Sequence, residues 1–314
     1  SGEYAMTRKS KARFGMSRTY KLNPAVKALR NVLFAGAAVA AVAPGAQAAC
    51  TVVDNTVTCT GFFNGTVNDG DEWSVALPFD PATVIFDSNT LISVTDQDGS
   101  FSFNLNDMSV ISYAEVNVYG FSTSVTGMTA ASAFGNSDFT NYGSVDVSAY
   151  NGFSATGIAS RSYYGDASAT NNGSISVYAE NGSATGISVV SDYGNASASN
   201  AGDISVTAHN YGSAAGISVI SPYGDASASN NGTINVNSVY AYAIGMLAVA
   251  PFGDVTLSNG VYGEISANSS SGGVAIGMYG VSYAGNVNIE NAGSTAAVSK
   301  YGNAFGAAAL STYG

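Results

Sequence analysis

The sequence predicts an all-β protein, a right-handed parallel β-helix (β-solenoid) with three strands in each coil of about 30 residues. Three observations lead to this fold. Short motifs return at a fixed interval through most of the 314-residue chain. Each repeat contains three short segments in which apolar and small polar residues alternate. Only 10% of the residues are charged, although roughly 25% is usual in globular domains, and 46% are hydrophobic.

Three motifs share one period. The first is a small residue, any residue, glycine and an aliphatic residue, and its glycines are 29, 30 or 32 positions apart. The second is an aromatic residue followed by glycine and Asp or Asn, as in Tyr193-Gly194-Asn195. The third is Asn followed two residues later by glycine. The repeated positions include Gly157, Gly186, Gly216 and Gly245 in the first motif, and Asn171, Asn200, Asn230 and Asn259 in the third.

Each repeated position has an expected structural role. Alternating strands bury one face, which predicts inward columns of like residues, such as Ile158, Ile187, Ile217 and Met246. The glycines are expected to supply positive φ at corners between strands. The Asn column predicts a buried amide ladder in which each side chain bonds the turn of the next coil. The aromatic column has two interpretations: a strip that stacks against carbohydrate, or stacked rings that cover a corner, which is the more common arrangement.

The start of the chain has the pattern of an export signal. Eight of the ten basic residues lie in the first 30 positions. From Met16, the expected natural start, a basic segment, an apolar run of about 13 residues and Ala46-Gln47-Ala48 form a secretory signal peptide, with cleavage between Ala48 and Ala49. A membrane-spanning helix would need roughly 20 apolar residues. We therefore interpret residues 1–48 as a signal peptide with a basic extension; a lipoprotein modified at Cys50 is the alternative.

Residues 49–105 lack the repeat but keep strand character, and they are expected to form a cap over the open end of the solenoid. Cys50 and Cys59 bracket an alternating segment centred on Asp54-Asn55. This pattern predicts a hairpin with a disulfide between its strands, with two free thiols as the alternative. Asp96 and Asp98 offer carboxylates for a calcium ion, although such a pair more often marks only a turn.

Residues 106–314 are assigned to the solenoid repeats, which offer little for chemistry. After residue 48 the chain has 2 basic residues, Arg161 and Lys300, and 20 acidic ones, a net charge of −18. Nucleic acid is excluded as a partner because binding it requires a basic face. A polysaccharide lyase would need Arg or Lys and a glycoside hydrolase a carboxylate pair, whereas the acids here fall at turns. With His209 as the one histidine, no catalytic residue, metal site or cofactor is predicted.

A resemblance that covers nearly the whole chain rests on segments such as AACTVVDNTVTCTG (48–61) and NNGSISVYAENGSATGISVVSDYGNASAS (171–199). They resemble the passenger region of type V secretion autotransporters of Gram-negative bacteria. The resemblance implies export to the cell surface or beyond, attachment to the outer membrane through a C-terminal β-barrel, and glycans or proteins of a host or surface as partners. We expect the chain to continue past Gly314 with further coils and that barrel.

The predicted function is accordingly a structural or adhesive passenger without catalytic activity. An ice-binding solenoid is the second hypothesis, although Thr, which ice-binding faces favour, is sparse. A β-helical enzyme acting on polysaccharides is the third, and a turnover assay on acidic glycans would test it. The ice-binding hypothesis depends on outward rows of small polar residues: Ser168, Ser197, Ser227 and Thr256, with Ser176, Ser205 and Asn235 beside them.

Overall fold

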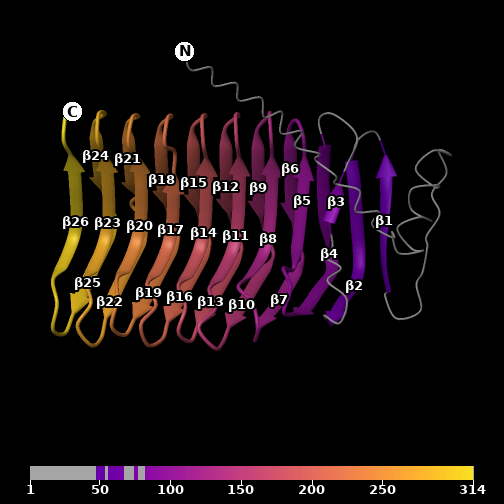
Figure 1. Cartoon of the computed structure of the whole chain (residues 1–314), viewed down its shortest axis with the longest axis horizontal. Coiled ribbons are helices and arrows are strands. Elements are labelled where there is room, and N and C mark those ends of the chain that lie inside the picture. Colours follow the sequence, from indigo (N-terminus) through magenta and orange to yellow (C-terminus); the bar gives the residue numbers. More distant parts are fainter. Residues whose placement is uncertain (1–46, 54–55, 67–73, 77–81, 314) are drawn as a thin grey trace, which may run out of the picture. The chain divides into compact units, whose positions relative to one another are not determined.

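The computed structural model describes residues 47–53, 56–66, 74–76 and 82–313. These residues form 26 strands and no helix, so none of the described segments is a helix able to cross a membrane (Figure 1). Parallel strands stack as a β-solenoid of about 8 turns with about 29 residues per turn, which confirms the predicted fold. The predicted signal peptide lies outside the described residues except at Gln47 and Ala48.

Each repeated coil contributes one strand to each of three walls, and the strands within a wall stack in parallel. Wall 1 is a nine-stranded sheet, and walls 2 and 3 belong to one 17-stranded sheet that two long N-terminal strands join. Wall 1 begins with two short strands and continues with the longest repeated strands: β3 (Ser74–Ala76), β5 (Ser100–Asn104), β8 (Val125–Ser132), β11 (Ala155–Ser162), β14 (Ala184–Ser191), β17 (Ala214–Ile220), β20 (Ala243–Ala250), β23 (Ala275–Ser282) and β26 (Ala304–Ser311).

Walls 2 and 3 follow wall 1 in each coil. Wall 2 contains β6 (Met108–Ser112), β9 (Ser137–Asn141), β12 (Ala167–Asn171), β15 (Ala196–Asn200), β18 (Ala226–Asn230), β21 (Val255–Asn259) and β24 (Val287–Asn291). Wall 3 contains β7 (Glu115–Gly120), β10 (Ser144–Ala149), β13 (Ser174–Ala179), β16 (Asp203–Ala208), β19 (Thr233–Ser238), β22 (Glu264–Ser269) and β25 (Ser294–Ser299). The long strands β2 (Thr56–Thr66) and β4 (Ala82–Thr95) each run along both of these walls.

The core is built from columns of like side chains, as the alternating pattern predicts. Ile158, Ile187, Ile217 and Met246 of wall 1 are fully buried. The facing columns from the other walls are buried as well: Val145, Ile175, Ile204, Ile234 and Ile265 of wall 3, and Ala167, Ala196, Ala226 and Val255 of wall 2. One coil cannot bury these side chains alone, so stacking supplies the hydrophobic driving force.

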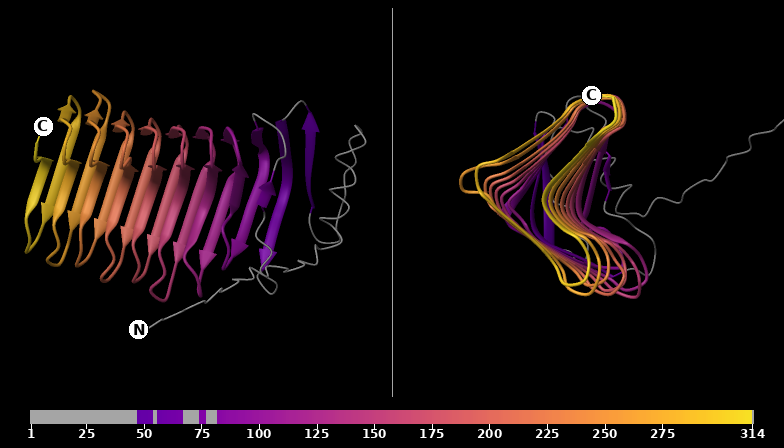
Figure 2. Two further views of the ribbon diagram at one scale, coloured as in Figure 1. Left: turned by 45° about the horizontal axis from the view of Figure 1, so that its top comes forward. Right: turned by 90° about the vertical axis from the view of Figure 1, so that its left-hand side faces the viewer.

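The glycine column has a different role from the one expected. Gly157, Gly186, Gly216 and Gly245 lie inside wall 1 strands, and none has positive φ. A Cβ at these positions would lie 2.4–2.6 Å from the carbonyl oxygen of the glycine one coil on and 2.3–2.6 Å from an isoleucine Cγ2 of wall 3. The end-on view in Figure 2 shows one wall bent toward the interior. The corner assignment was therefore wrong: glycine is required because walls 1 and 3 approach too closely for a side chain.

The Asn column forms the predicted ladder at the corner between walls 2 and 3. Each Nδ2 donates to the Oδ1 of the Asn one coil on, at 2.8–2.9 Å, from Asn141 through Asn171, Asn200, Asn230 and Asn259 to Asn291. Each Nδ2 also donates to the carbonyl of the glycine in its own turn, at 2.9–3.2 Å. The amides thus satisfy buried backbone groups that the corner would otherwise leave without partners.

At the N-terminal end, β1 (Gln47–Val53) pairs antiparallel with β2, and Cys50 and Cys59 form a disulfide with a Cα–Cα distance of 4.0 Å. This confirms the predicted cross-strand bond, while its turn at Asp54-Asn55 lies outside the described residues. The expected cleavage site, Ala48-Ala49, falls within β1. β2 pairs in parallel with β4, and β4 pairs in parallel with β6 of wall 2 and β7 of wall 3. The stacked strands of the solenoid therefore extend into residues 49–105, the segment expected to form a cap.

Candidate functional site

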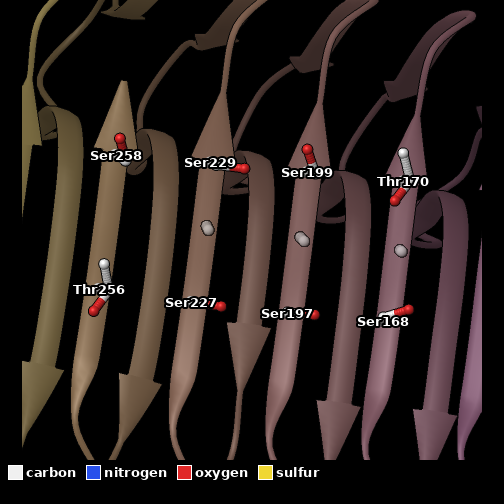
Figure 3. Close-up of a pocket in the computed structure, with 11 residues that line it drawn as sticks. Ser168, Thr170, Ser197, Ser199, Ser227, Ser229, Thr256 and Ser258 are labelled. Atoms are coloured by element: carbon white, nitrogen blue, oxygen red, sulfur yellow. The ribbon is translucent and has the colours of Figure 1, made fainter. Parts of the chain in front are cut away.

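The outer face of wall 2 carries two rows of hydroxyl groups on strands β12, β15, β18 and β21 (Figure 3). Neighbouring strands are about 4.8 Å apart, and alternate residues in one strand about 6.7 Å apart, so the hydroxyls form a regular lattice. The paired positions are Ser168, Ser197, Ser227 and Thr256 in one row and Thr170, Ser199, Ser229 and Ser258 in the other.

The lattice does not include all the residues expected in it. Ser176, Ser205 and Asn235 are exposed, but they lie on wall 3, around the corner that the Asn ladder occupies. The sequence pattern could not separate these two walls, since both alternate with the same period of two. The flat polar surface is therefore confined to wall 2.

The aromatic column stands at the corner between walls 1 and 2. Neighbouring rings from Phe134 to Phe252 have centroids 5.1–5.6 Å apart and planes within 16° of each other. The inner rings, Tyr164, Tyr193 and Tyr223, therefore use both faces to stack on other rings, which favours the corner interpretation over stacking on a sugar. A hydrogen bond with Tyr163 raises the pKa of Tyr193, so the phenols also interact at this corner.

Wall 1 carries an apolar patch that the sequence reasoning missed. We define it as the outward side chains of β20 and β23 together with Phe305 and Leu310, which continue two of their rows on β26, all paired in register. In earlier coils the corresponding positions hold mostly polar or small residues, such as Thr156, Ala159 and Arg161 on β11. The sequence signal for this patch is a segment in which apolar and polar residues no longer alternate: residues 243–250 read AIGMLAVA, without one polar side chain. The patch residues of β20 and β23 are Ile244, Leu247, Val249, Ile276, Tyr279 and Val281.

Asp96 and Asp98 use their carboxylates to join coils. Oδ1 of Asp96 accepts from the backbone N–H groups of Phe121 and Ser122, and Oδ1 of Asp98 accepts from that of Thr126 at 2.6 Å. Burial acts to raise the pKa of Asp96, but the two N–H donors outweigh it and hold that pKa below its usual value. The geometry matches the turn interpretation. No group of three His, Cys, Asp or Glu able to hold a metal occurs in the part of the chain described.

The remaining reactive groups are dispersed on the surface. His209 is exposed just after β16, and Arg161 lies 3.7 Å from Asp192. The Nζ of Lys300 lies 4.9 Å from the ring centroid of Tyr301. The carboxylates of Asp166 and Asp225 each accept a backbone N–H from the next coil, which gives them a structural role.

No protein-family model, curated protein or solved structure matches this chain. A β-solenoid by itself does not identify a family, because one fold can serve many functions. The features available for function are therefore the hydroxyl lattice of wall 2, the aromatic column and the apolar patch of wall 1.

Proposed function

We propose that this chain is an exported, non-catalytic passenger of the autotransporter type with an adhesive role, and that the apolar patch of wall 1 is its contact surface. The disulfide supports an oxidising location outside the cytoplasm. The pattern of residues 16–48 supports export. The apolar patch is the observation that carries the adhesive role.

Two rows of the patch continue across three neighbouring strands. Val249 of β20 pairs with Val281 of β23, which pairs with Leu310 of β26, and the row through Ile244 continues in the same way to Phe305. Ile244, Leu247 and Val249 of β20 and Tyr279 and Val281 of β23 are partly exposed, whereas Ile276 is buried. A contiguous apolar surface on a soluble rod marks an interaction site, because leaving it in water is unfavourable.

The rest of the solenoid can serve as a scaffold that presents this patch. The amide ladder and the tightly packed glycines connect each coil to the next, so the patch strands are held in one register. The acidic surface also limits self-association away from the patch, since like charges repel. We therefore expect the partner to be an apolar region of a protein or glycan on another surface.

The test is adhesion of beads coated with the secreted protein to immobilised host-surface proteins and glycans. Leu247→Ser combined with Val249→Thr should reduce adhesion at least about tenfold, since each removes apolar contact area. Ser199→Ala combined with Ser229→Ala on wall 2 is the matched control and should bind normally. Equal adhesion of both variants, with unchanged circular dichroism, would exclude the patch as the contact surface.

Ice binding is the second candidate, and the register of the wall 2 hydroxyls favours it. A rigid, regularly spaced polar lattice can order water at an ice surface. Thermal hysteresis of the secreted protein would support this function if Ser199→Tyr, which places a bulky ring in the lattice, abolished it. Absence of hysteresis in the unaltered protein would end this hypothesis.

A further inference from the structure

The aromatic column forms one side of a surface that the proposed adhesive role does not use. We define the aromatic ladder as Phe134, Tyr164, Tyr193, Tyr223 and Phe252. These rings are 48–63% exposed although they stack on one another, so their edges face solvent along five successive coils. Such a continuous row of ring edges offers a long, straight apolar contact.

A column of glycines follows the ladder residue by residue. A Cβ at Gly165, Gly194, Gly224 or Gly253 would lie 2.1–2.4 Å from the carbonyl oxygen of the preceding glycine in the column. Such contacts exclude every residue with a side chain. The strip next to the ring edges therefore carries no side chain of its own, and the Oδ1 atoms of Asp166, Asn195 and Asp225 border it, 2.7–2.9 Å from the positions that a Cβ would take.

A column of Asp and Asn residues lies on the other side of the glycines. Each Oδ1 accepts the backbone N–H one coil on at 2.7–2.9 Å, which fixes these side chains in a row, yet Asp166, Asp225 and Asp254 remain exposed. The row therefore places negative charge parallel to the ring edges. The guanidinium of Arg161 pairs with the carboxylate of Asp192 at 3.7 Å.

We propose that the aromatic ladder, the glycine column and the Asp/Asn column together bind long, planar aromatic cations that lie along the solenoid axis. The ring edges supply apolar contact over several coils, and the glycine column leaves space for a flat molecule beside them. The carboxylates supply the charge complementarity, and the acidic chain adds long-range attraction. Sugars are poor candidates because the inner rings have no free face.

The test is a fluorescence titration of the secreted protein with thioflavin T, a planar benzothiazolium cation. Tyr193→Ser combined with Tyr223→Ser should weaken binding about tenfold or more, because each substitution removes apolar contact area from the middle of the site. Asp225→Asn should weaken binding several-fold and reduce its salt dependence, while Asn at this position keeps the N–H acceptor, as Asn195 does. Tyr211→Ser, in a stacked pair at another corner, is the matched control and should bind normally.

Several results would overturn the proposal. One is no fluorescence change with the unaltered protein, and another is unchanged affinity in the double Tyr variant with an intact circular dichroism spectrum. Equal affinity for an uncharged analogue of the dye would show that the carboxylates do not contribute to binding, which would contradict the preference for cations. The patch variant Leu247→Ser/Val249→Thr should still bind the dye, so this site and the adhesive surface can fail separately.

Discussion

Asn171 and Asn200 lie 29 residues apart in the chain, and Nδ2 of Asn171 donates a hydrogen bond of 2.8 Å to Oδ1 of Asn200. Both side chains are buried. The same relationship recurs through five consecutive steps, so every amide in the middle of the ladder depends on both of its neighbours. A change at one Asn should therefore disturb two coil interfaces.

Asn171→Ala should lower the free energy of unfolding by about 2–4 kcal/mol, because several buried polar groups lose a partner and each such loss costs about 1–3 kcal/mol. The neighbouring Asn172 is exposed, and Asn172→Ala should change stability by no more than about 0.5 kcal/mol. Urea denaturation followed by far-ultraviolet circular dichroism measures both. Similar midpoints for the two variants would contradict a stabilising ladder.

Gly186→Ala should destabilise the solenoid by about 1–3 kcal/mol through overpacking. Its Cβ would lie 2.6 Å from the carbonyl oxygen of Gly216 and 2.6 Å from Cγ2 of Ile204. Ser188→Ala, at an outward position of the same strand, is the matched control and should change stability by no more than about 0.5 kcal/mol. Thermal unfolding of both variants tests this reasoning, and a neutral Gly186→Ala would refute it.

Removing the disulfide with Cys50→Ala and Cys59→Ala should destabilise the N-terminal hairpin by about 2–3 kcal/mol, as expected for a short loop. The effect should remain local because each coil contacts only its neighbours. Hydrogen exchange should accelerate in β1 and β2 and stay unchanged in β14. Equal acceleration in all strands would show that the end of the solenoid controls the whole fold.

Asp146→Ser should stabilise the protein at neutral pH by up to about 0.5 kcal/mol. Asp146 is exposed on wall 3, but partial desolvation by its surroundings raises its pKa above the ordinary value of 3.8. The folded state then binds this proton more tightly than the unfolded chain, so stability rises as pH falls through the raised pKa, and the ionised carboxylate is unfavourable at pH 7. The next coils carry Ser176 and Ser205 at this position.

Thermal unfolding at pH 7 and just above pH 3.8 measures this effect. The stabilisation should be larger at pH 7, and the reverse change, Ser176→Asp, should lower stability there. A less stable Asp146→Ser at pH 7 would show that the carboxylate makes a favourable contact.

The periodicity of the sequence predicted the walls, the buried columns and the Asn ladder because stacking in register places identical residues on top of one another. Ile187, for example, can occupy only the column of Ile158 and Ile217 once the period is known. The disulfide was predictable for a similar reason, since a hairpin centred between Cys50 and Cys59 places them opposite each other.

The candidate sites were less predictable. The aromatic, glycine and Asp/Asn columns were visible as sequence motifs, but their lateral arrangement depends on how the chain turns at that corner. The apolar patch depends on a change in residue type at outward positions, and inward and outward positions become distinct only when the walls are assigned.

The sequence by itself therefore determined the coil length, the number of strands per coil and the identity of the stacked columns, because all of these follow from a local pattern repeated along the chain. Tertiary structure decided why Gly186 must be glycine, since Ile204 of wall 3 approaches it from across the core. It also decided that Ser168 and Ser176 face different directions. Distances across the core and angles between walls arise from packing among all three walls, and a local pattern does not contain them.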